Sequence, residues 1–205
     1  MTMRVLGTRS VAILPAAGAS RRMGRPKLLL PVGGRPMVAG VVEALRGGGV
    51  GEVVLVTAPG DEALQAWARE AGVTLAVNPD PERGMLSTIR EGIAALGGSA
   101  GLARRGEILL VSPADLPNLR AGTVAELLRR MAETGAPIGV PVFHGKRGHP
   151  LAIAPRLIPE IDSLDPNVGL KQVRDRHEAE LLEVQTEDSG AIQDVDTPEE
   201  YERAQ

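Results

Sequence analysis

The chain has 205 residues, 43% of them apolar, so it can bury one good core, and we expect residues 1–205 to form a single domain. A net charge of −3 and a content of one Phe, one Trp and one Tyr argue against nucleic-acid binding, which uses a broad basic face and aromatic stacking platforms. Cysteine is absent, and neither a signal-peptide core nor an apolar run of about 18 residues occurs, so we expect a cytoplasmic protein with no membrane association.

An apolar run at residues 11–14 predicts a first buried strand, and a basic loop follows it. Residues 16–19 are all small, so backbone N–H groups can converge on anionic oxygens there, while Arg22 and Lys27 supply positive charge. Residues 21–35 hold five cations and no acid in a chain of negative net charge, which a bound anion would explain. The spacing fits neither the P-loop nor the dinucleotide fingerprint. The loop therefore predicts a polyphosphate site, with a solvated basic turn as the alternative.

Short apolar runs alternate with helical patterns along the following part of the chain. The apolar runs, typical of parallel strands covered on both faces, lie at residues 53–56, 73–77 and 108–111. The helical patterns lie at residues 36–46, 61–71, 85–96 and 121–134. This alternation predicts an α/β fold with a doubly wound, mostly parallel sheet. We expect glycine-rich connections at residues 47–51 and 97–106, the second of them a mobile loop.

Acidic residues stand where a doubly wound sheet binds its ligands, beyond the carboxyl ends of the strands. Asp115 lies between two prolines in the segment that follows the apolar run at residues 108–111. A carboxylate beside a phosphate site is a natural Mg²⁺ ligand. The alternative is that Asp115 only caps a helix or stabilises a turn. Near the C-terminal end, Thr197 and Glu200 predict a capping box for a final helix. Asp194 and Asp196 have no such structural explanation, and we expect one of them to reach the metal.

The basic loop resembles the opening of the MobA-like nucleotidyltransferases, whose first strand runs into a Leu-Pro-Ala-Ala-Gly or Leu-x-Ala-Gly segment and then Arg-Met-Gly-x-x-Lys. The matching residues are Leu14, Ala16, Ala17, Gly18, Ser20, Arg22, Met23, Gly24 and Lys27. Further segments similar to family motifs follow in the family's order at residues 83–92, 113–117, 145–150 and 194–200. The resemblance fits the molybdenum cofactor cytidylyltransferase branch best, and it implies a Rossmann-like nucleotidyltransferase fold.

The resemblance also implies a role for individual residues. At the nucleotide it places Leu14, Ala16, Ala17, Gly18, Arg22, Lys27, Gly84 and Ser87. Arg22, Lys27 and Asp115 would carry the catalysis, and Asp115 and Asp196 would hold Mg²⁺. His149 would contact the acceptor. Considered without the resemblance, Ser87 is a small residue that allows close helix packing, and His149 is a locally hydrogen-bonded turn residue.

The implied activity is transfer of a nucleoside monophosphate from an NTP, expected to be CTP, to a phosphorylated acceptor, expected to be molybdopterin, with release of pyrophosphate. The implied protein partner is a molybdoenzyme or its chaperone. One segment departs from the branch, because residues 164–171 lack the arginine of its Gly-Asp-x-Gly-Ala-Arg motif and offer Lys171 only as a point charge. A sugar phosphate or methylerythritol phosphate therefore stays open as the acceptor, as does a non-catalytic nucleotide-binding module on the same fold.

Overall fold

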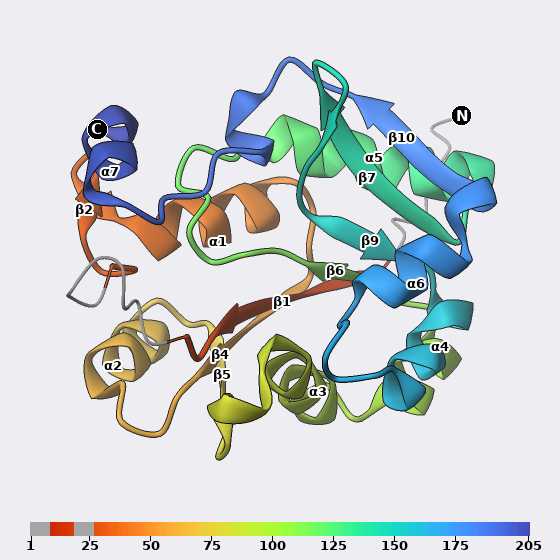
Figure 1. Ribbon diagram of the computed structural model, residues 1–205, viewed down its shortest axis with the longest axis horizontal. Helices are drawn as coiled ribbons and strands as arrows, with labels where there is room; N and C mark the ends of the chain where they lie inside the picture. Colours follow the sequence, from red (N-terminus) through yellow and green to blue (C-terminus); the bar gives the residue numbers. More distant parts are fainter. Residues whose placement is uncertain (1–8, 19–26) are drawn as a thin grey trace, which may run out of the picture.

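A computed structural model describes residues 9–18 and 27–205, which are built around one eight-stranded sheet (Figure 1). In spatial order its strands are β10 (Leu181–Gln185), β7 (Ile138–Phe143), β9 (Leu151–Ile153), β6 (Ile108–Val111), β1 (Ser10–Ala16), β4 (Glu52–Thr57) and β5 (Thr74–Val77), with β8 (Lys146–Arg147) paired to β7. Strand β1 is parallel to β4 and β6, and β7 is parallel to β10. Strand β9 is antiparallel to both of its neighbours. The sheet is mixed and mostly parallel, which confirms the predicted fold class.

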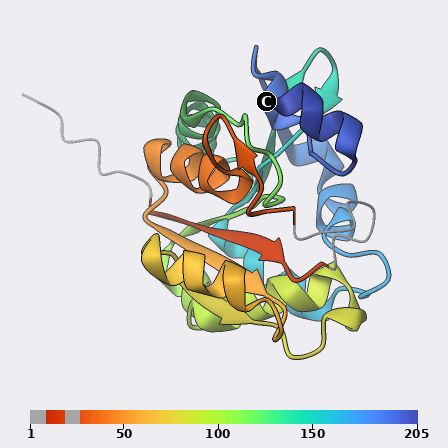
Figure 2. The same ribbon diagram turned by 90° about the vertical axis from the view of Figure 1, so that its left-hand side faces the viewer.

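Helices cover both faces of the sheet because successive side chains of its strands enter two different apolar clusters. Ala12 and Leu14 belong to the cluster formed with α1 (Met37–Gly47), α2 (Glu62–Glu70) and α5 (Ala121–Thr134). Val11 and Ile13 belong to the cluster formed with α3 (Met85–Ala95), α4 (Ser99–Arg105), α6 (Lys171–Arg176) and the 3₁₀ segment η3 (Pro155–Ser163). Both ribbon views show β1 running between α1 above and α3 below (Figures 1 and 2). The helices of the described ranges all fall short of the length and apolarity that a membrane crossing requires.

All helices and strands predicted between residues 11 and 134 are present within two residues of their predicted bounds. The predicted mobile loop at residues 97–106 is wrong, because α4 occupies most of it. Gly97 and Gly98 adopt positive φ angles of +87° and +81° and turn the chain between α3 and α4, and Leu102 is fully buried. The glycines therefore separate two helices. The sequence patterns did not predict β7 to β10, η3 or α6.

The C-terminal part of the chain returns to the carboxyl edge of the sheet. Its elements are η4 (Glu178–Glu180), η5 (Ser189–Ala191) and α7 (Pro198–Ala204), while a short η2 (Pro81–Arg83) precedes α3. The buried Asp188 accepts hydrogen bonds from the backbone N–H of Arg120, at 2.8 Å, and from Thr123 Oγ1, at 2.7 Å. Helix α7 packs on the ribbon of β2 (Pro31–Val32) and β3 (Arg35–Pro36), where Tyr201 Oη donates to the carbonyl of Pro31 at 2.7 Å. The capping box of Thr197 and Glu200 at α7 is confirmed.

Close packing of α3 on β1 provides a test of this arrangement. A Cβ atom at Gly92 would lie 2.8 Å from Ile13 Cγ2 in the core, so we expect Gly92→Ala to lower the free energy of unfolding by about 1–3 kcal/mol. Gly122 is also helical, in α5, but a Cβ there has no atom within 4 Å. The control Gly122→Ala should be neutral or stabilise by up to about 1 kcal/mol. Urea denaturation measures both, and equal stability of the two variants would contradict the packing.

Candidate functional site

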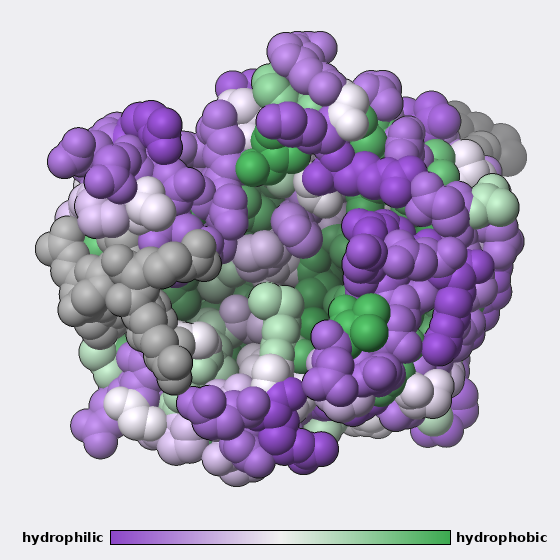
Figure 3. Space-filling view, in the orientation of Figure 1, coloured by the Kyte–Doolittle hydropathy of each residue, from purple (hydrophilic) through white to green (hydrophobic). Residues whose placement is uncertain are grey.

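A cavity of about 970 Å³ lies beyond the carboxyl ends of β1 and β6. The space-filling view shows a hollow in this face with apolar surface inside it and mostly hydrophilic side chains around it (Figure 3). The predicted site residues that line the cavity are Ala16, Ala17, Gly18, Lys27, Gly84, Asp115, His149 and Asp196. Motifs far apart in the sequence therefore meet in one place, at the edge of the sheet where the fold class predicts a ligand.

Two predicted nucleotide residues are placed differently, and a third lies outside the described residues. Leu14 is fully buried in the sheet and does not line the cavity, so only its backbone could act on a ligand. The Ser87 hydroxyl donates to the carbonyl of Gly84 at 2.7 Å and accepts from Asn78 Nδ2 at 2.9 Å, so it is engaged at the start of α3. Arg22 lies outside the described residues, and its role stays a prediction.

Lys27 forms the centre of a polar cluster on the cavity wall. The side chain is buried, with 8% exposure of the residue, and its Nζ donates to Asp115 Oδ2 at 2.6 Å, Asp196 Oδ1 at 2.6 Å and the carbonyl of Val195 at 2.8 Å. These three bonds use all the N–H donors of an ammonium group. Burial alone would lower the pKa of Lys27, but the hydrogen bonds to Asp115 and Asp196 and their negative charges outweigh it and raise the pKa. Lys27 was expected at the phosphates, and here its charge is balanced by the two carboxylates.

The two carboxylates are fixed by different parts of the chain. Asp115 follows β6, and its carbonyl accepts a hydrogen bond from the N–H of Val195 at 3.1 Å, which joins this loop to the C-terminal segment. The N–H of Asp196 donates to Glu200 Oε2 at 2.8 Å, beside the capping box of α7. The helix cap therefore orients the backbone that presents Asp196 to Lys27.

The carboxylates suit a hard divalent cation. Among the described residues, Asp115 Oδ1 is a buried oxygen without a hydrogen-bond partner, which a cation would satisfy. The described ranges contain no group of three or more His, Asp or Glu that could hold a metal ion, but Mg²⁺ typically takes one or two carboxylates and completes its shell with substrate phosphates and water. Partial burial raises the pKa of Asp194, and the negative charge of Asp115 raises it further. Asp115 together with Asp194 or Asp196 is the donor set that fits Mg²⁺.

His149 presents an imidazole to the cavity. Its backbone N–H donates to the carbonyl of Ala191 at 2.8 Å. The ring is open to the cavity, but the surrounding wall limits its contact with bulk water and this lowers the pKa of His149. The charge of Asp115 opposes the shift, and that of Arg174 adds to it. His149 is therefore neutral near pH 7 and can donate one hydrogen bond and accept another.

The cavity wall also contains side chains that the sequence analysis did not place there. They are Met85, Thr88, Arg147, Val168, Lys171 and Arg174. The sequence contained a signal for Arg147, which lies in the same family-like segment, residues 145–150, as His149, and for Lys171, which lies in the segment that departs from the family. It contained none for Arg174, because a single arginine in a polar helix is common.

Removal of the Lys27 ammonium should destabilise the fold. Lys27→Met would leave two carboxylates close together and mostly buried, so we expect a loss of about 3 kcal/mol, at the lower end of the range for breaking a buried ion pair because the site retains some solvent contact. The loss is measured by urea denaturation at pH 7. Lys146→Met on β8 removes the same group from an exposed position and should change stability by less than about 0.5 kcal/mol. Adding Asp115→Asn and Asp196→Asn to Lys27→Met should restore part of the stability, and a further loss would contradict the ion-pair assignment.

Known proteins are similar to most of this chain. Residues 12–181 match the family of the MobA-like NTP transferase domain. The nicotine blue oxidoreductase of Paenarthrobacter nicotinovorans is 32% identical over 200 residues, which cover 93% of this chain and 94% of that protein. The molybdenum cofactor cytidylyltransferase of Escherichia coli K12 is 27% identical over 196 residues, which cover 92% of each chain. The bifunctional protein GlmU of Agrobacterium fabrum is 34% identical over 140 residues, which cover 67% of this chain but only 30% of that protein.

Solved structures repeat the same fold. Rv0371c from Mycobacterium tuberculosis H37Rv superposes with a TM-score of 0.75 at 25% identity, covering 100% of this chain and 98% of the other. A structure of Rv0371c in complex with manganese superposes with a TM-score of 0.69 at 23% identity, covering 96% and 98%. The sheet, the position of the cavity and the match over residues 12–181 lead to one assignment: the chain belongs to the MobA-like NTP transferase family.

Proposed function

We propose that the chain transfers a nucleoside monophosphate from CTP to the phosphate of molybdopterin and releases pyrophosphate, with Mg²⁺ as the metal. The observation that carries the proposal is the cluster of Lys27, Asp115 and Asp196 in the cavity at the carboxyl edge of the sheet. The buried Asp115 Oδ1, which has no hydrogen-bond partner, supports a cation site, and catalysis of nucleotidyl transfer uses such a site more directly than nucleotide binding alone does.

The transfer is an in-line displacement at the α-phosphorus. An oxygen of the acceptor phosphate forms the new P–O bond, the bond from the α-phosphorus to the bridging oxygen breaks, and its electron pair leaves with pyrophosphate. The attacking phosphate is already ionised near pH 7, so no general base is needed. Catalysis then consists of holding both substrates in line and stabilising charge on the phosphoryl oxygens.

Different residues of the cavity would bind the nucleotide, hold the carboxylates in place and contact the acceptor. The small residues Ala16, Ala17 and Gly18 bring the backbone close to the nucleotide, and a Cβ at Gly18 would meet no atom of the described residues within 4 Å. Lys27 holds Asp115 and Asp196 in place, and it can contact a phosphate only by giving up one of its three hydrogen bonds. Neutral His149 offers a hydrogen bond to the acceptor.

Asp115, with Asp194 or Asp196, would hold the metal. When bound, Mg²⁺ supplies positive charge to the α-phosphoryl and pyrophosphate oxygens. The manganese complex of Rv0371c, a protein of the same fold, supports the use of a divalent cation. The second ligand can be identified by comparing Asp194→Asn with Asp196→Asn in a Mn²⁺ titration.

The proposed identity of the acceptor is supported by the sequence match alone. The molybdenum cofactor cytidylyltransferase of E. coli aligns over nearly the full length of both chains, which supports molybdopterin. Methylerythritol phosphate and sugar phosphates are the alternative acceptors of the same chemistry. The molybdoenzyme or chaperone partner and the cytoplasmic location stay predictions.

A second candidate function is oxidation–reduction, and the observation that favours it is the 32% identity to nicotine blue oxidoreductase over 200 residues. The two candidates are separated by incubating the purified protein anaerobically with nicotine blue and either NADH or NADPH as electron donor. Dye-dependent loss of the reduced cofactor, together with no pyrophosphate release from any NTP and acceptor pair, would replace the transferase proposal.

Asp115 should be essential for turnover. Asp115→Asn keeps the side-chain size but removes the charge, so we expect the protein to fold and turnover to fall by about a hundredfold or more at saturating Mg²⁺. Pyrophosphate release and melting temperature are measured on the same samples. Glu133→Gln, which removes a carboxylate from the exposed face of α5, serves as the control and should retain full activity. Near-normal turnover of Asp115→Asn would refute the metal assignment.

CTP should be preferred over GTP. A pocket that pairs its polar groups with cytosine leaves them unsatisfied against guanine, at about 1–3 kcal/mol for each lost partner, which is roughly a five- to hundredfold preference in kcat/KM. We would measure pyrophosphate release for CTP, GTP, ATP and UTP against molybdopterin, methylerythritol phosphate and a set of sugar phosphates. Turnover with GTP at or above that with CTP contradicts the nucleotide assignment, and CTP turnover only with a sugar or methylerythritol phosphate transfers the function to that acceptor.

A further inference from the structure

The positive charges on the cavity wall are unevenly balanced. The cations of the described wall are Lys27, Arg147, Lys171 and Arg174. Lys27 is neutralised by its two carboxylates. Arg147 donates from Nη2 to Glu178 Oε1 and from Nε to Glu183 Oε1, both at 2.6 Å. Each of these two cations is already paired with two carboxylates, so neither is expected to attract a further anion.

Lys171 and Arg174 differ from them. They lie three positions apart on α6, which places them on one face of the helix. The Lys171 side chain makes no hydrogen bond or ion pair with any described residue, and the Arg174 side chain hydrogen-bonds only the adjacent Asp175, with Nη2 at 3.2 Å from Oδ1. Partly exposed pairs of this kind contribute little to stability, so Arg174 remains available to a ligand. This face of α6 therefore carries the unbalanced positive charge of the described wall.

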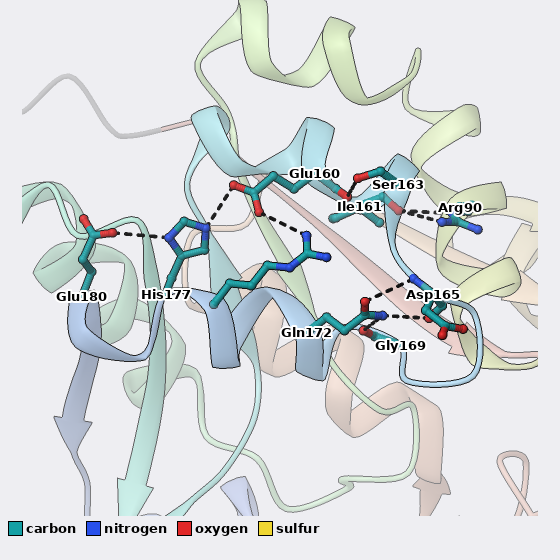
Figure 4. A network of polar contacts seen from close by, with 10 residues as sticks. Arg90, Glu160, Ile161, Ser163, Asp165, Gly169, Gln172, His177 and Glu180 are labelled. Carbon is teal, nitrogen blue, oxygen red and sulfur yellow. Dashed lines mark hydrogen bonds and ion pairs between the residues drawn. The ribbon is translucent and has the colours of Figure 1, made fainter.

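The loop at residues 164–170, which leads into α6, is held in place by hydrogen bonds from both sides (Figure 4). From α3, Arg90 Nη2 donates to the carbonyl of Leu164, the first residue of the loop, at 3.0 Å, and to the carbonyls of Ile161 and Asp162 just before it at 2.9 and 3.0 Å. From α6, Gln172 Nε2 donates to the carbonyl of Asp165 at 2.8 Å. A loop that is ordered before a ligand arrives loses little conformational entropy on binding.

Val168 lies in this loop and lines the cavity with 50% of the residue exposed. The other large apolar residues with high exposure in the described ranges are Met85 and Val77. Met85 lines the cavity on the segment expected at the nucleotide, and Val77 lies away from it on β5. An apolar side chain beside two available cations suits a ligand that has both an anionic group and an apolar face.

We propose that Val168, Lys171 and Arg174 form the acceptor subsite, and that it selects a phosphate monoester attached to a flat, apolar ring. Lys171 and Arg174 bind the phosphate, and Val168 packs against the face of the ring. A sugar phosphate fits less well, because its hydroxyl groups would lose water against Val168 without gaining partners. The inference rests on the proposed function for the identity of the second substrate.

The position of the subsite agrees with an in-line reaction. The charge of Arg174 acts on the His149 ring, and so does the charge of Asp115. His149, Asp115 and Arg174 line the same cavity, so the ring lies within electrostatic range of both the proposed acceptor subsite and the proposed metal ligand. A phosphate bound by Lys171 and Arg174 would then be held beside the nucleotide end of the cavity.

The test measures binding of two probes without NTP. Pyridoxine 5′-phosphate, whose phosphate is joined to an aromatic ring through one methylene group, is titrated by its fluorescence, and ribose 5-phosphate is titrated by competition. We expect the ring compound to bind at least tenfold more tightly to the wild type. Lys171→Gln and Arg174→Gln should each weaken both probes about tenfold, the size of one charge-assisted hydrogen bond. Val168→Ser should weaken only the ring compound.

Matched control variants outside the cavity show whether binding depends on these particular residues or only on the protein's overall charge and exposed apolar surface. Lys146→Gln removes the remaining lysine of the chain, which does not line the cavity, and Val77→Ser alters an exposed valine outside it, so both should bind as the wild type does. Equal wild-type affinity for the two probes, or unchanged binding in Lys171→Gln and Arg174→Gln, overturns the proposal. If binding depends on these residues but the protein transfers nucleotide to no acceptor, the subsite is supported and only the proposed function is refuted.

Discussion

The hydrogen bonds of the Lys27 ammonium hold the wall of the cavity together. Two carboxylate oxygens lie 2.6 Å from the same nitrogen, and without that nitrogen their charges would repel each other in a partly buried place. One carboxylate belongs to the loop after β6 and the other to the segment before α7, so the ammonium joins the middle of the chain to its C-terminal end. The ribbon of β2 and β3 follows Lys27 closely, and α7 packs on that ribbon. The ribbon, the final helix and the edge of the sheet are thereby fixed to one another.

The sequence patterns predicted the elements that carry strong apolar signals and missed those that lack them. β6 consists of four buried apolar residues and has the predicted bounds. β8 is two exposed charged residues, and β10 has a mostly half-buried or exposed pattern, so neither differs from a loop in sequence, and both become strands by pairing with β7. At residues 97–106 the high glycine content indicated a loop. The burial of Leu102, in the cluster that also contains side chains of η3, instead makes this segment a helix.

The candidate site was predictable by residue type and position, but its pairings were not. Asp115 and Asp196 could be selected because they follow a strand end and precede a helix cap, and both line the cavity. Their contact with Lys27 spans 88 and 169 positions, and a single sequence carries no sign of such a contact. Arg174 reaches the wall only because α6 packs beside η3, which is a tertiary effect. Charge and motif order thus indicate which residues form a site, while folding decides which charges neutralise one another.

The charge of the cluster places a condition on nucleotide binding. Lys27 carries one positive charge against two negative charges of Asp115 and Asp196, so at neutral pH the described cluster is net negative and repels a triphosphate. A divalent cation at the carboxylates reverses that sign, which is the electrostatic reason to propose that metal and nucleotide bind together. Lys171 and Arg174 can attract an anion without a divalent cation, because no described carboxylate of the cavity wall pairs with them. In the proposed reaction, charge would therefore direct the two anionic substrates to different groups of residues in one cavity, and only the nucleotide would depend on the metal.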